Sequence, residues 1–330
     1  MSRPQCRICG QIEGNRTLAA REMMFGMRDR FEYIVCSACG CVQIATVPTP
    51  QDLARFYPTD YYAFAPPRRR PSRFQRFKRR RHAAHLLGLP NPLGWLSTRR
   101  HGVPPPIEYL RRSGIRRSQA VLDVGSGSGA RLLDMWSYGC TWLTGIDPFV
   151  PHDIEYWNGV RVLKRDLEDY NGRHDLVMLH HTFEHMGAPL AVLERLRSLL
   201  NQGGVLLLRV PLASSEAFAT YGADWVQLDA PRHLYAHTAK SIALLAKQAG
   251  WEILQVVYDS TAFQFWGSEQ YRRDIPLLDP RSYQVNPAAS IFTRADIAAF
   301  ESRARKLNED GRGDQACFYL RVLDRHGIPH

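Results

Sequence analysis

Four of the seven cysteines of this 330-residue chain fall into two matched pairs, Cys6 with Cys9 and Cys36 with Cys39. Each pair has two residues between its cysteines and a glycine directly after it. Two thiolates at this spacing can point into one turn, and two such turns complete the four-sulfur shell of a structural zinc ion. Two disulfides are the alternative, but the odd cysteine count and the absence of a secretion signal do not favour a disulfide framework. The pattern therefore predicts structural Zn²⁺ held by these four cysteines.

A glycine-rich turn follows an apolar strand in VLDVGSGSGARLL, at residues 121–133. Glycines at 125, 127 and 129 leave backbone without Cβ atoms, so that a ligand can lie directly on the turn. The same letters also fit a dinucleotide fingerprint, with Asp147 about 20 residues further on. Asp123 stands two positions before the first glycine, where its charge suits a ligand with an amino group better than a diphosphate. A cationic cofactor is therefore favoured over NAD.

From residue 119 onward, apolar strands alternate with amphipathic helices, which is typical of a parallel sheet covered on both faces. Strands are expected over 119–125, 141–147, 160–164, 174–180, 203–211, 251–258 and 315–323, and helices over 130–138, 189–201 and 239–249. Two long connections, 211–235 and 259–315, interrupt this alternation. Long connections at the carboxyl ends of strands usually carry function, so we expect them to form the acceptor pocket.

Five segments between 119 and 257 resemble class I S-adenosylmethionine (SAM) dependent methyltransferases in order and spacing. They are VLDVGSGSG, GIDP, KRDLEDY, HDLVMLHHTFEHM and LRSLLNQGGVLLLRVP. The resemblance implies an α/β fold with a Rossmann-like, seven-stranded SAM-methyltransferase sheet. It also implies that Asp147 holds the ribose hydroxyls of SAM and that Asp166 and Leu167 read the adenine. The cofactor-binding residues carried over in this way are Asp123, Gly125, Gly127, Gly129, Asp147, Pro148, Asp166, Leu167 and His180.

The N-terminal segments CRICG, YIVCSACGCVQI and QDLARFYPTDYYAF resemble the zinc-binding domain of NDP-deoxysugar C-methyltransferases and related glycan-cluster methyltransferases. That resemblance predicts a zinc ribbon over 1–60, with strands at 31–36 and 41–45, and a sugar or glycan as methyl acceptor. It places Tyr61 and Tyr62 over the sugar. An aromatic, Arg- and Pro-rich linker with helices is expected over 61–118, and the methyltransferase domain over 119–330.

The segment DAPRHLYAHTAKSIALLA, at 229–246, is similar to the part of these enzymes that carries the catalytic base, which places His233 in that role. Trp225, Asp229 and Arg232 are expected to line the acceptor pocket. The family's Tyr-x-Glu-His is replaced here by Asp-x-x-Arg-His, and its C-terminal Rossmann-like extension is missing. Methylation of oxygen, nitrogen or carbon therefore stays open, as does a role for His233 in fixing the loop by hydrogen bonding.

A second histidine cluster follows the fourth predicted strand at His180, His181, Glu184 and His185. A similar Glu-x-x-Glu-His segment in quinone O-methyltransferases has been linked to a divalent ion, although His181 replaces the first acid here. The alternative is that Glu184 and His185 orient the following loop.

The net charge of +11, from 43 Lys and Arg against 32 Asp and Glu, is concentrated in one segment. Residues 66–118 hold 15 of these cations and one acid, Glu108. This segment is either a solvated connector or a contact to an anionic membrane surface or polyanionic glycan carrier. It also motivates the alternative of a nucleic-acid methyltransferase. A binding module with a vestigial cofactor fold is a third alternative. No apolar run reaches membrane-spanning length, so a cytoplasmic location is expected.

Overall fold

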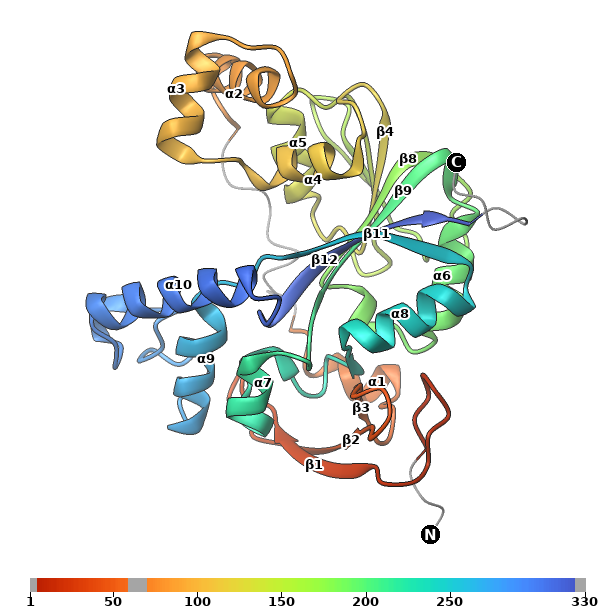
Figure 1. Cartoon of the computed structure of the whole chain (residues 1–330), viewed down its shortest axis with the longest axis vertical. Coiled ribbons are helices and arrows are strands. Elements are labelled where there is room, and N and C mark those ends of the chain that lie inside the picture. The colour runs from red at the N-terminus through yellow and green to blue at the C-terminus, as the bar shows by residue number, and fades with distance from the viewer. Residues whose placement is uncertain (1–4, 59–69, 324–330) are drawn as a thin grey trace. The chain divides into compact units, whose positions relative to one another are not determined.

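The computed structural model of the chain describes residues 5–58 and 70–323 (Figure 1). Packing divides it into two compact units. Unit 1 contains the described residues of Met1–Pro58, His181–Leu193 and Arg209–Phe318, and unit 2 contains those of Thr59–His180, Glu194–Leu208 and Tyr319–His330. These divisions follow different lines from the predicted domains at 1–60, 61–118 and 119–330, which stay predictions.

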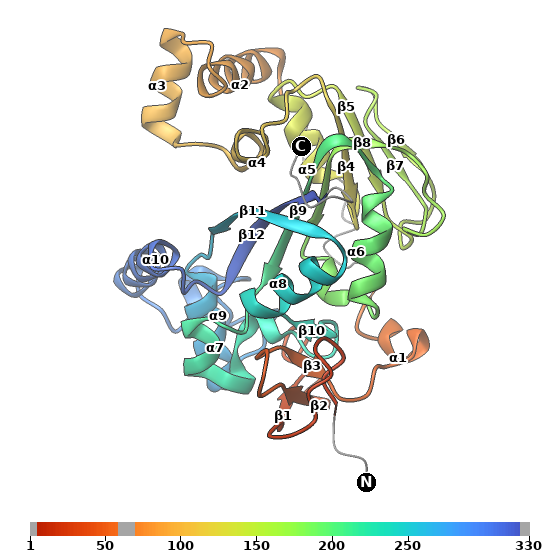
Figure 2. The ribbon, with the colours of Figure 1, turned by 45° about the vertical axis from the view of Figure 1, so that its right-hand side comes forward.

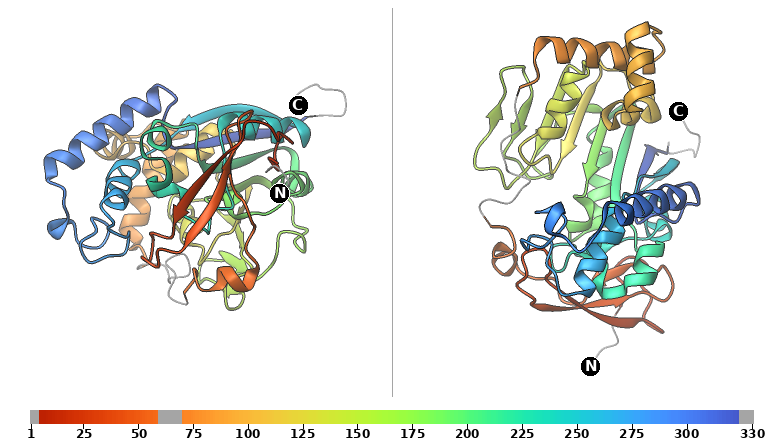
Figure 3. Two further views of the ribbon diagram at one scale, coloured as in Figure 1. Left: turned by 90° about the horizontal axis from the view of Figure 1, so that it is seen from below. Right: turned by 90° about the vertical axis from the view of Figure 1, so that its left-hand side faces the viewer.

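Unit 1 holds a four-stranded sheet in the order β1-β2-β3-β10. Its strands are β1 (Arg16–Arg21), β2 (Arg30–Val35), β3 (Val42–Ile44) and β10 (Tyr235–Ala236). Figure 3 shows β1 and β2 as a long red hairpin. β2 and β3 confirm the strands predicted at 31–36 and 41–45. β10 is an addition that the sequence did not predict: Tyr235 pairs with Gln43 and Ala236 with Val42, so a much later segment completes the N-terminal sheet.

The larger sheet has the strand order β11-β12-β9-β8-β4-β5-β7-β6. All seven predicted strands are present, and the eighth is the two-residue β6, which pairs antiparallel with β7 at the edge. The sheet therefore has one strand more than the seven that the sequence predicts. Burial of residues 176–179 and 205–208 explains their continuous apolar sequence, because helices cover both faces of such sheets. The strands are β4 (Ala120–Val124), β5 (Trp142–Ile146), β6 (Ile154–Glu155), β7 (Arg161–Leu163), β8 (His174–His180), β9 (Leu200–Pro211), β11 (Trp251–Tyr258) and β12 (Gln315–Val322).

Two of the predicted helices are confirmed closely, as α5 (Ala130–Ser137) and α8 (Ala239–Gln248). α8 begins at a capping box, in which the side chains of Thr238 and Ser241 satisfy each other's backbone N–H groups. The helix predicted over 189–201 is shorter, because α6 (Pro189–Arg197) ends early and Leu200 already belongs to β9. Apolar spacing did not separate the last turn of this helix from the strand that follows it.

The remaining helices lie in the segments that the strand alternation did not explain. The basic segment forms three of them and the two long connections form most of the others, so neither region lacks regular structure. They are α1 (Pro50–Ala54), α2 (Arg73–Leu86), α3 (Pro92–His101), α4 (Pro105–Ser113), α7 (Glu216–Tyr221), α9 (Phe263–Arg272) and α10 (Arg294–Glu309), with short 3-10 turns at Phe183–His185, Gly222–Asp224, Val226–Leu228 and Pro287–Ala289. Within the described ranges, no helix combines the length and apolar character needed to cross a bilayer.

Candidate functional site

The glycine turn follows β4, at the point where the strand order of the large sheet reverses. β5 and β7 lie to one side of β4 and β8 lies to the other. In open α/β sheets, ligands bind outside the carboxyl ends of the strands at such a point. Gly125, Gly127 and Gly129 have φ angles of 71°, 53° and 79°, which residues with a Cβ rarely adopt. The turn therefore presents bare backbone where the fold places a ligand.

Asp147, directly after β5, ties the glycine turn to the neighbouring strand. Its Oδ2 accepts a hydrogen bond from the Gly127 backbone N–H at 2.8 Å, and its Oδ1 accepts one from the Phe149 N–H at 2.9 Å. Burial raises the pKa of Asp147, and these two N–H groups oppose that rise. Each carboxylate oxygen has two lone pairs, so each can accept one more hydrogen bond. The carboxylate thus fits the predicted role of holding ribose hydroxyls.

Asp123 lies inside β4 with its side chain almost fully buried. Burial raises its pKa to about 6, while Arg131, whose Nε lies 3.8 Å from Oδ2, pulls the pKa down. A carboxyl group with this pKa is mostly ionised at neutral pH. Its negative charge beside the turn fits the ammonium group of an amino-acid-like ligand.

The other predicted cofactor residues also belong to unit 2. Pro148 is half-buried, Asp166 is exposed and Leu167 is buried, with its carbonyl accepting from Arg195 Nε at 3.3 Å. His180 ends β8, and its ring centre lies 4.8 Å from that of Tyr109. All nine residues thus share one compact unit, and their contacts with SAM stay a prediction.

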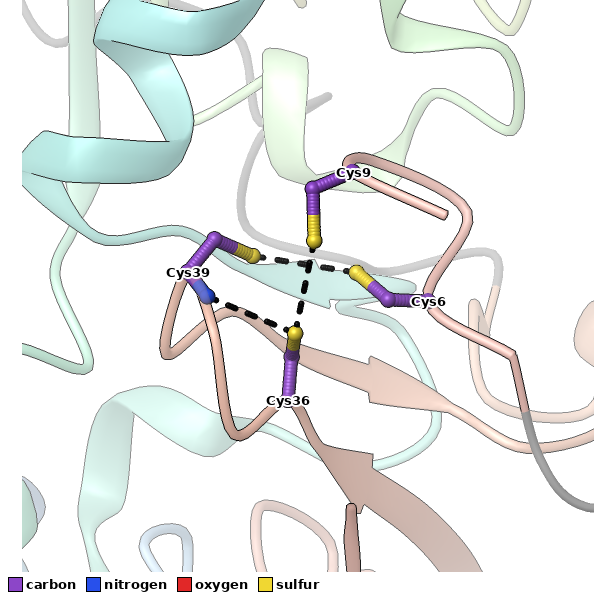
Figure 4. Close-up of side chains that lie close together, drawn as sticks. All are labelled: Cys6, Cys9, Cys36 and Cys39. Atoms are coloured by element: carbon purple, nitrogen blue, oxygen red, sulfur yellow. Dashed lines mark hydrogen bonds between the residues drawn. The ribbon is translucent and has the colours of Figure 1, made fainter. Parts of the chain in front are cut away.

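The four paired cysteines converge in unit 1 (Figure 4). Cys6 Sγ lies 3.7 Å from Cys39 Sγ, Cys9 Sγ lies 3.5 Å from Cys36 Sγ, and the four sulfurs lie within 4.8 Å of one another. Zinc–sulfur bonds of about 2.3 Å place the corners of a tetrahedron about 3.8 Å apart. The four sulfurs therefore have the spacing of a tetrahedral zinc shell.

The two cysteine turns share one backbone geometry. The N–H of Gly10 donates to the Cys6 carbonyl at 2.9 Å, and the N–H of Gly40 donates to the Cys36 carbonyl at 3.0 Å. Both glycines have positive φ, at 77° and 73°. The Cys39 N–H points at Cys36 Sγ at 3.4 Å, so the second turn also supplies a backbone donor to a sulfur. This explains why a glycine follows each pair.

His233 lies in unit 1 with its ring held in one orientation. Nδ1 lies 2.8 Å from the carbonyl oxygen of Gln227, which can only accept, so Nδ1 carries the proton and Nε2 carries the lone pair. Nε2 lies 3.9 Å from Glu184 Oε1 and 3.9 Å from Asp229 Oδ2. Burial, followed by the nearby His185, lowers the pKa of His233 to about 4. A neutral imidazole therefore faces two carboxylates at neutral pH.

Glu184 is the centre of this cluster and has no exposed surface. Burial alone would raise its pKa, but the hydrogen bond and charge of His181, together with His233 and His185, lower it to about 2. His181 Nδ1 lies 3.2 Å from Glu184 Oε1, and His185 Nδ1 lies 2.8 Å from the Arg232 carbonyl. The carboxylate is thus ionised and surrounded by imidazoles.

The same cluster has the composition of a cation site. Glu184, His185 and His233 each offer one ligand atom, and these atoms lie within 4.8 Å of one another. Both histidines donate Nδ1–H to backbone carbonyls, which leaves Nε2 free to bind a metal or a proton. A metal would occupy the His233 lone pair, so the cluster can hold a divalent ion or supply a base, but not both through this residue.

Arg232, directly before His233 in the sequence, has a large, fully buried side chain. Its guanidinium donates to Asp229 through Nε at 3.0 Å and Nη2 at 2.6 Å, to Glu22 Oε1 at 2.8 Å and to the Phe56 carbonyl at 3.3 Å. The Asp229 carboxylate, which faces His233, is therefore held by two charge-assisted hydrogen bonds. This position makes Arg232 part of the framework around His233, and its predicted contact with the acceptor stays a prediction.

Comparison with known proteins addresses the glycine turn and the sheet around it. Residues 95–256 match the family model for a methyltransferase domain. The chain carries a SAM-dependent methyltransferase domain. The turn, Asp123 and Asp147 all lie inside the matched range, in agreement with the resemblance seen in the sequence.

Solved structures similar to the methyltransferase share little sequence with it. A cyclopropane synthase from Mycobacterium tuberculosis is 16% identical, with a TM-score of 0.41, covering 65% of this chain and 83% of that one. A SAM-dependent methyltransferase from Mesorhizobium loti is 14% identical, with a TM-score of 0.41 and coverages of 65% and 96%. Coclaurine N-methyltransferase bound to N-methylheliamine and SAH is 14% identical, with a TM-score of 0.40 and coverages of 66% and 70%. No curated protein matches the chain.

The other residues predicted to line the acceptor pocket of the methyltransferase are Trp225, Tyr61 and Tyr62. Trp225 is fully buried, and its indole N–H donates to Asp314 Oδ2 at 3.0 Å, so this side chain packs in the interior of unit 1. Tyr61 and Tyr62 lie outside the described residues. Tyr57, from the same aromatic run, is described, and its hydroxyl lies 3.3 Å from His185 Nδ1.

Three residues near His233 were missed by sequence reasoning. Glu22 binds Arg232, Tyr33 donates its hydroxyl to the His233 carbonyl at 2.9 Å, and the Gln227 carbonyl fixes the His233 tautomer. Glu22 directly precedes the apolar run Met23–Phe25, and an acid beside such a run was a usable signal of a buried charge. The other two contacts leave no signal in residue type or spacing.

Proposed function

We propose that this methyltransferase modifies a small polar acceptor of the sugar or nucleotide-sugar class and that His233 removes the acceptor's proton. The observation that carries the assignment of the base is the pair of carboxylates, Glu184 and Asp229, facing Nε2 of a neutral, tautomer-fixed imidazole. Support for a sugar comes from the resemblance of the cysteine-bearing N-terminal region to that of sugar methyltransferases.

SAM supplies an electrophilic methyl group, and the electrons of the broken carbon–sulfur bond stay on sulfur. The acceptor atom that bonds to this methyl group must lose a proton when it is a hydroxyl oxygen or a carbon. His233 Nε2 would take that proton, and the charge then created would lie between the Glu184 and Asp229 carboxylates. Arg232 would keep Asp229 in place during this change.

Asp123, Asp147 and the glycine turn are the groups that we propose bind the cofactor. Asp147 would accept from the ribose hydroxyls, Asp123 would sit near the ammonium group, and the bare backbone of Gly125–Gly129 would let the ligand approach closely. Pro148, Asp166, Leu167 and His180 complete the proposed set.

Product analysis with methyl-labelled SAM tests the acceptor class. The full-length enzyme is incubated with a panel of nucleotide sugars and, separately, with RNA, and label is located by mass spectrometry. We expect label on a sugar, and His233→Gln should abolish it while the protein still binds SAM. Label on RNA, with none on any sugar, would overturn the acceptor assignment.

Metal analysis of the same protein tests whether His233 acts as a base or as a metal ligand in the Glu184 cluster. If His233 is the base, the wild-type protein should hold no divalent ion at this cluster. No bound ion should then be lost on Glu184→Gln or His185→Gln. A stoichiometric ion lost in these two variants, and retained in an exposed control such as His152→Gln, would assign His233 to the metal and refute its role as base.

We further propose that Cys6, Cys9, Cys36 and Cys39 hold a structural Zn²⁺, which would tie the turn before β1 to the turn between β2 and β3. The sulfur distances support this. We expect one zinc per chain, with Cys36→Ser losing the zinc and lowering the unfolding temperature. Cys140→Ser, a substitution outside the cluster, should keep the zinc. Wild-type protein that folds with clearly less than one zinc per chain would contradict the proposal.

A further inference from the structure

The hairpin of α2 and α3 in unit 2 carries exposed apolar and basic side chains that have no part in the proposed function. The two helices lie side by side in Figures 1 and 2. Residues 73–101 contain eight Arg and Lys and no acid. Six large apolar side chains on this hairpin have exposed fractions between 47% and 64%, namely Phe74, Phe77, Leu89, Leu93, Trp95 and Leu96. We define the hairpin surface as these six residues together with the exposed cations Arg73, Lys78, Arg81, Arg99 and Arg100.

One face of α2 is already occupied by contacts within unit 2. The Arg76 guanidinium lies 3.7 Å from the centre of the Trp136 ring, and Arg79 Nη1 lies 2.9 Å from Asp134 Oδ1. Both partners belong to α5. Part of the basic charge of this segment therefore anchors α2 to α5. The sequence alone allowed residues 66–118 to be either a solvated connector or a docking element.

The opposite face of α2 belongs to the hairpin surface. At 100° per residue, Phe74, Phe77 and Arg81 project away from the side that carries Arg76. Lys78 is on this outer side too, with Nζ 4.3 Å from the centre of the Phe74 ring. Cations and exposed aromatic rings thus occupy the same stretch of helix.

The second helix repeats this combination. Leu93 and Leu96 are three residues apart and share a face of α3. The Arg99 guanidinium lies 4.7 Å from the centre of the Trp95 ring. Close crossing of the helices supports the arrangement, because a Cβ on Gly94 would meet His85 Cβ at 2.3 Å. The hairpin is therefore a packed unit with outward-facing apolar and basic groups.

We propose that the hairpin surface docks the protein onto an anionic lipid bilayer. Apolar side chains flanked by Arg and Lys suit the boundary between acyl chains and phosphate headgroups, where the long basic side chains can reach the phosphates. Single-stranded nucleic acid would use the cations and the aromatic rings, but Leu89, Leu93 and Leu96 would gain nothing from base stacking. The proposal is independent of the acceptor and of the role of His233.

Vesicle co-sedimentation of the full-length protein tests the proposal. Vesicles of phosphatidylcholine mixed with phosphatidylglycerol should bind at least about tenfold more protein than vesicles of phosphatidylcholine alone. A combined Phe74→Ser, Phe77→Ser and Leu96→Ser variant should lose this binding, as should Arg73→Glu, Lys78→Glu and Arg81→Glu together.

Two controls change exposed positions outside the hairpin surface. Trp142→Ser removes an exposed aromatic residue from β5, and Arg294→Glu, Arg305→Glu and Lys306→Glu reverse three charges on α10. Both controls should bind vesicles like the wild type, and all variants should retain SAM affinity as proof of folding.

Several outcomes would overturn the proposal. These are equal binding to both kinds of vesicle, loss of binding in the α10 control, or retention of binding in the hairpin variants. Displacement from anionic vesicles by a single-stranded RNA that binds tightly through the same cations would assign the surface to nucleic acid instead.

Discussion

Arg232 and Glu22 form a fully buried ion pair, with Arg232 Nη2 at 2.8 Å from Glu22 Oε1. Glu22 comes from the loop between β1 and β2, and Arg232 immediately precedes His233. The same Glu22 carboxylate accepts backbone N–H groups from Met24, Phe25 and Met27. The N-terminal hairpin thus fixes the arginine that holds Asp229 beside the proposed base.

Glu22→Gln should destabilise the protein and reduce turnover. Removing one partner of a buried ion pair leaves the other charge uncompensated, which costs about 3–5 kcal/mol. We expect a lower unfolding temperature and a reduced kcat, with the Kd for SAM unchanged because the predicted cofactor residues belong to unit 2. Glu32→Gln, on an exposed side chain of β2, is the matched control and should behave like the wild type. A Glu22→Gln variant as stable and active as the control would remove Glu22 from the framework.

His233→Gln should lower kcat by about 10² or more while SAM still binds. Glutamine can keep a hydrogen bond to the Gln227 carbonyl but cannot take up a proton. If His233 only fixes the loop, this variant should retain most of its activity. If His233 is the base, the variant should lose it. Calorimetric SAM binding and single-turnover methyl transfer separate the two, with exposed His152→Gln as the control.

The free energy of unfolding should fall as the pH decreases from about 6.5 to about 4. Burial lowers the pKa of His174, His233 and His237 to about 4 in the folded protein, against an ordinary value of 6.5. Between these values the unfolded chain binds protons that the folded protein does not. Within this range, each histidine therefore lowers the free energy of unfolding by about 1.4 kcal/mol for every unit by which the pH falls.

Urea unfolding at several pH values measures this slope. His174→Gln should make it shallower by the contribution of one histidine, even if it changes stability at pH 7. The same slope in the wild type and in His174→Gln would show that the His174 imidazole is not held neutral.

Asp147→Asn should weaken SAM binding by about tenfold or more, because a neutral amide loses one acceptor oxygen and the charge that strengthens hydrogen bonds to hydroxyls. The amide would also face the Gly127 N–H with a donor in one of its orientations. Isothermal titration measures the affinity, and Asp169→Asn, at an exposed position, is the control. Equal affinities for the two variants would refute the cofactor assignment.

Much of the large sheet was predictable, because most of its strands contain an apolar run bounded by turn residues. The two-residue β6 has no such run, and the end of α6 merges with β9 in an unbroken apolar pattern. The glycine turn was predictable because its residues are adjacent in the sequence, and Asp147 was singled out by the resemblance of GIDP to a family motif. Glu22 and Tyr33 reach the His233 loop through contacts between distant segments, which residue spacing does not encode.

The pairing of β3 with β10 has a consequence for how the protein is made. During synthesis, Val42 and Gln43 emerge long before Ala236 and Tyr235, their partners in the sheet. At roughly 5–20 residues per second, the N-terminal sheet waits on the order of 10–40 seconds for its last strand. An exposed edge of β3 must persist on the ribosome for that time, and a fragment that stops after the cysteines never acquires the strand that covers it.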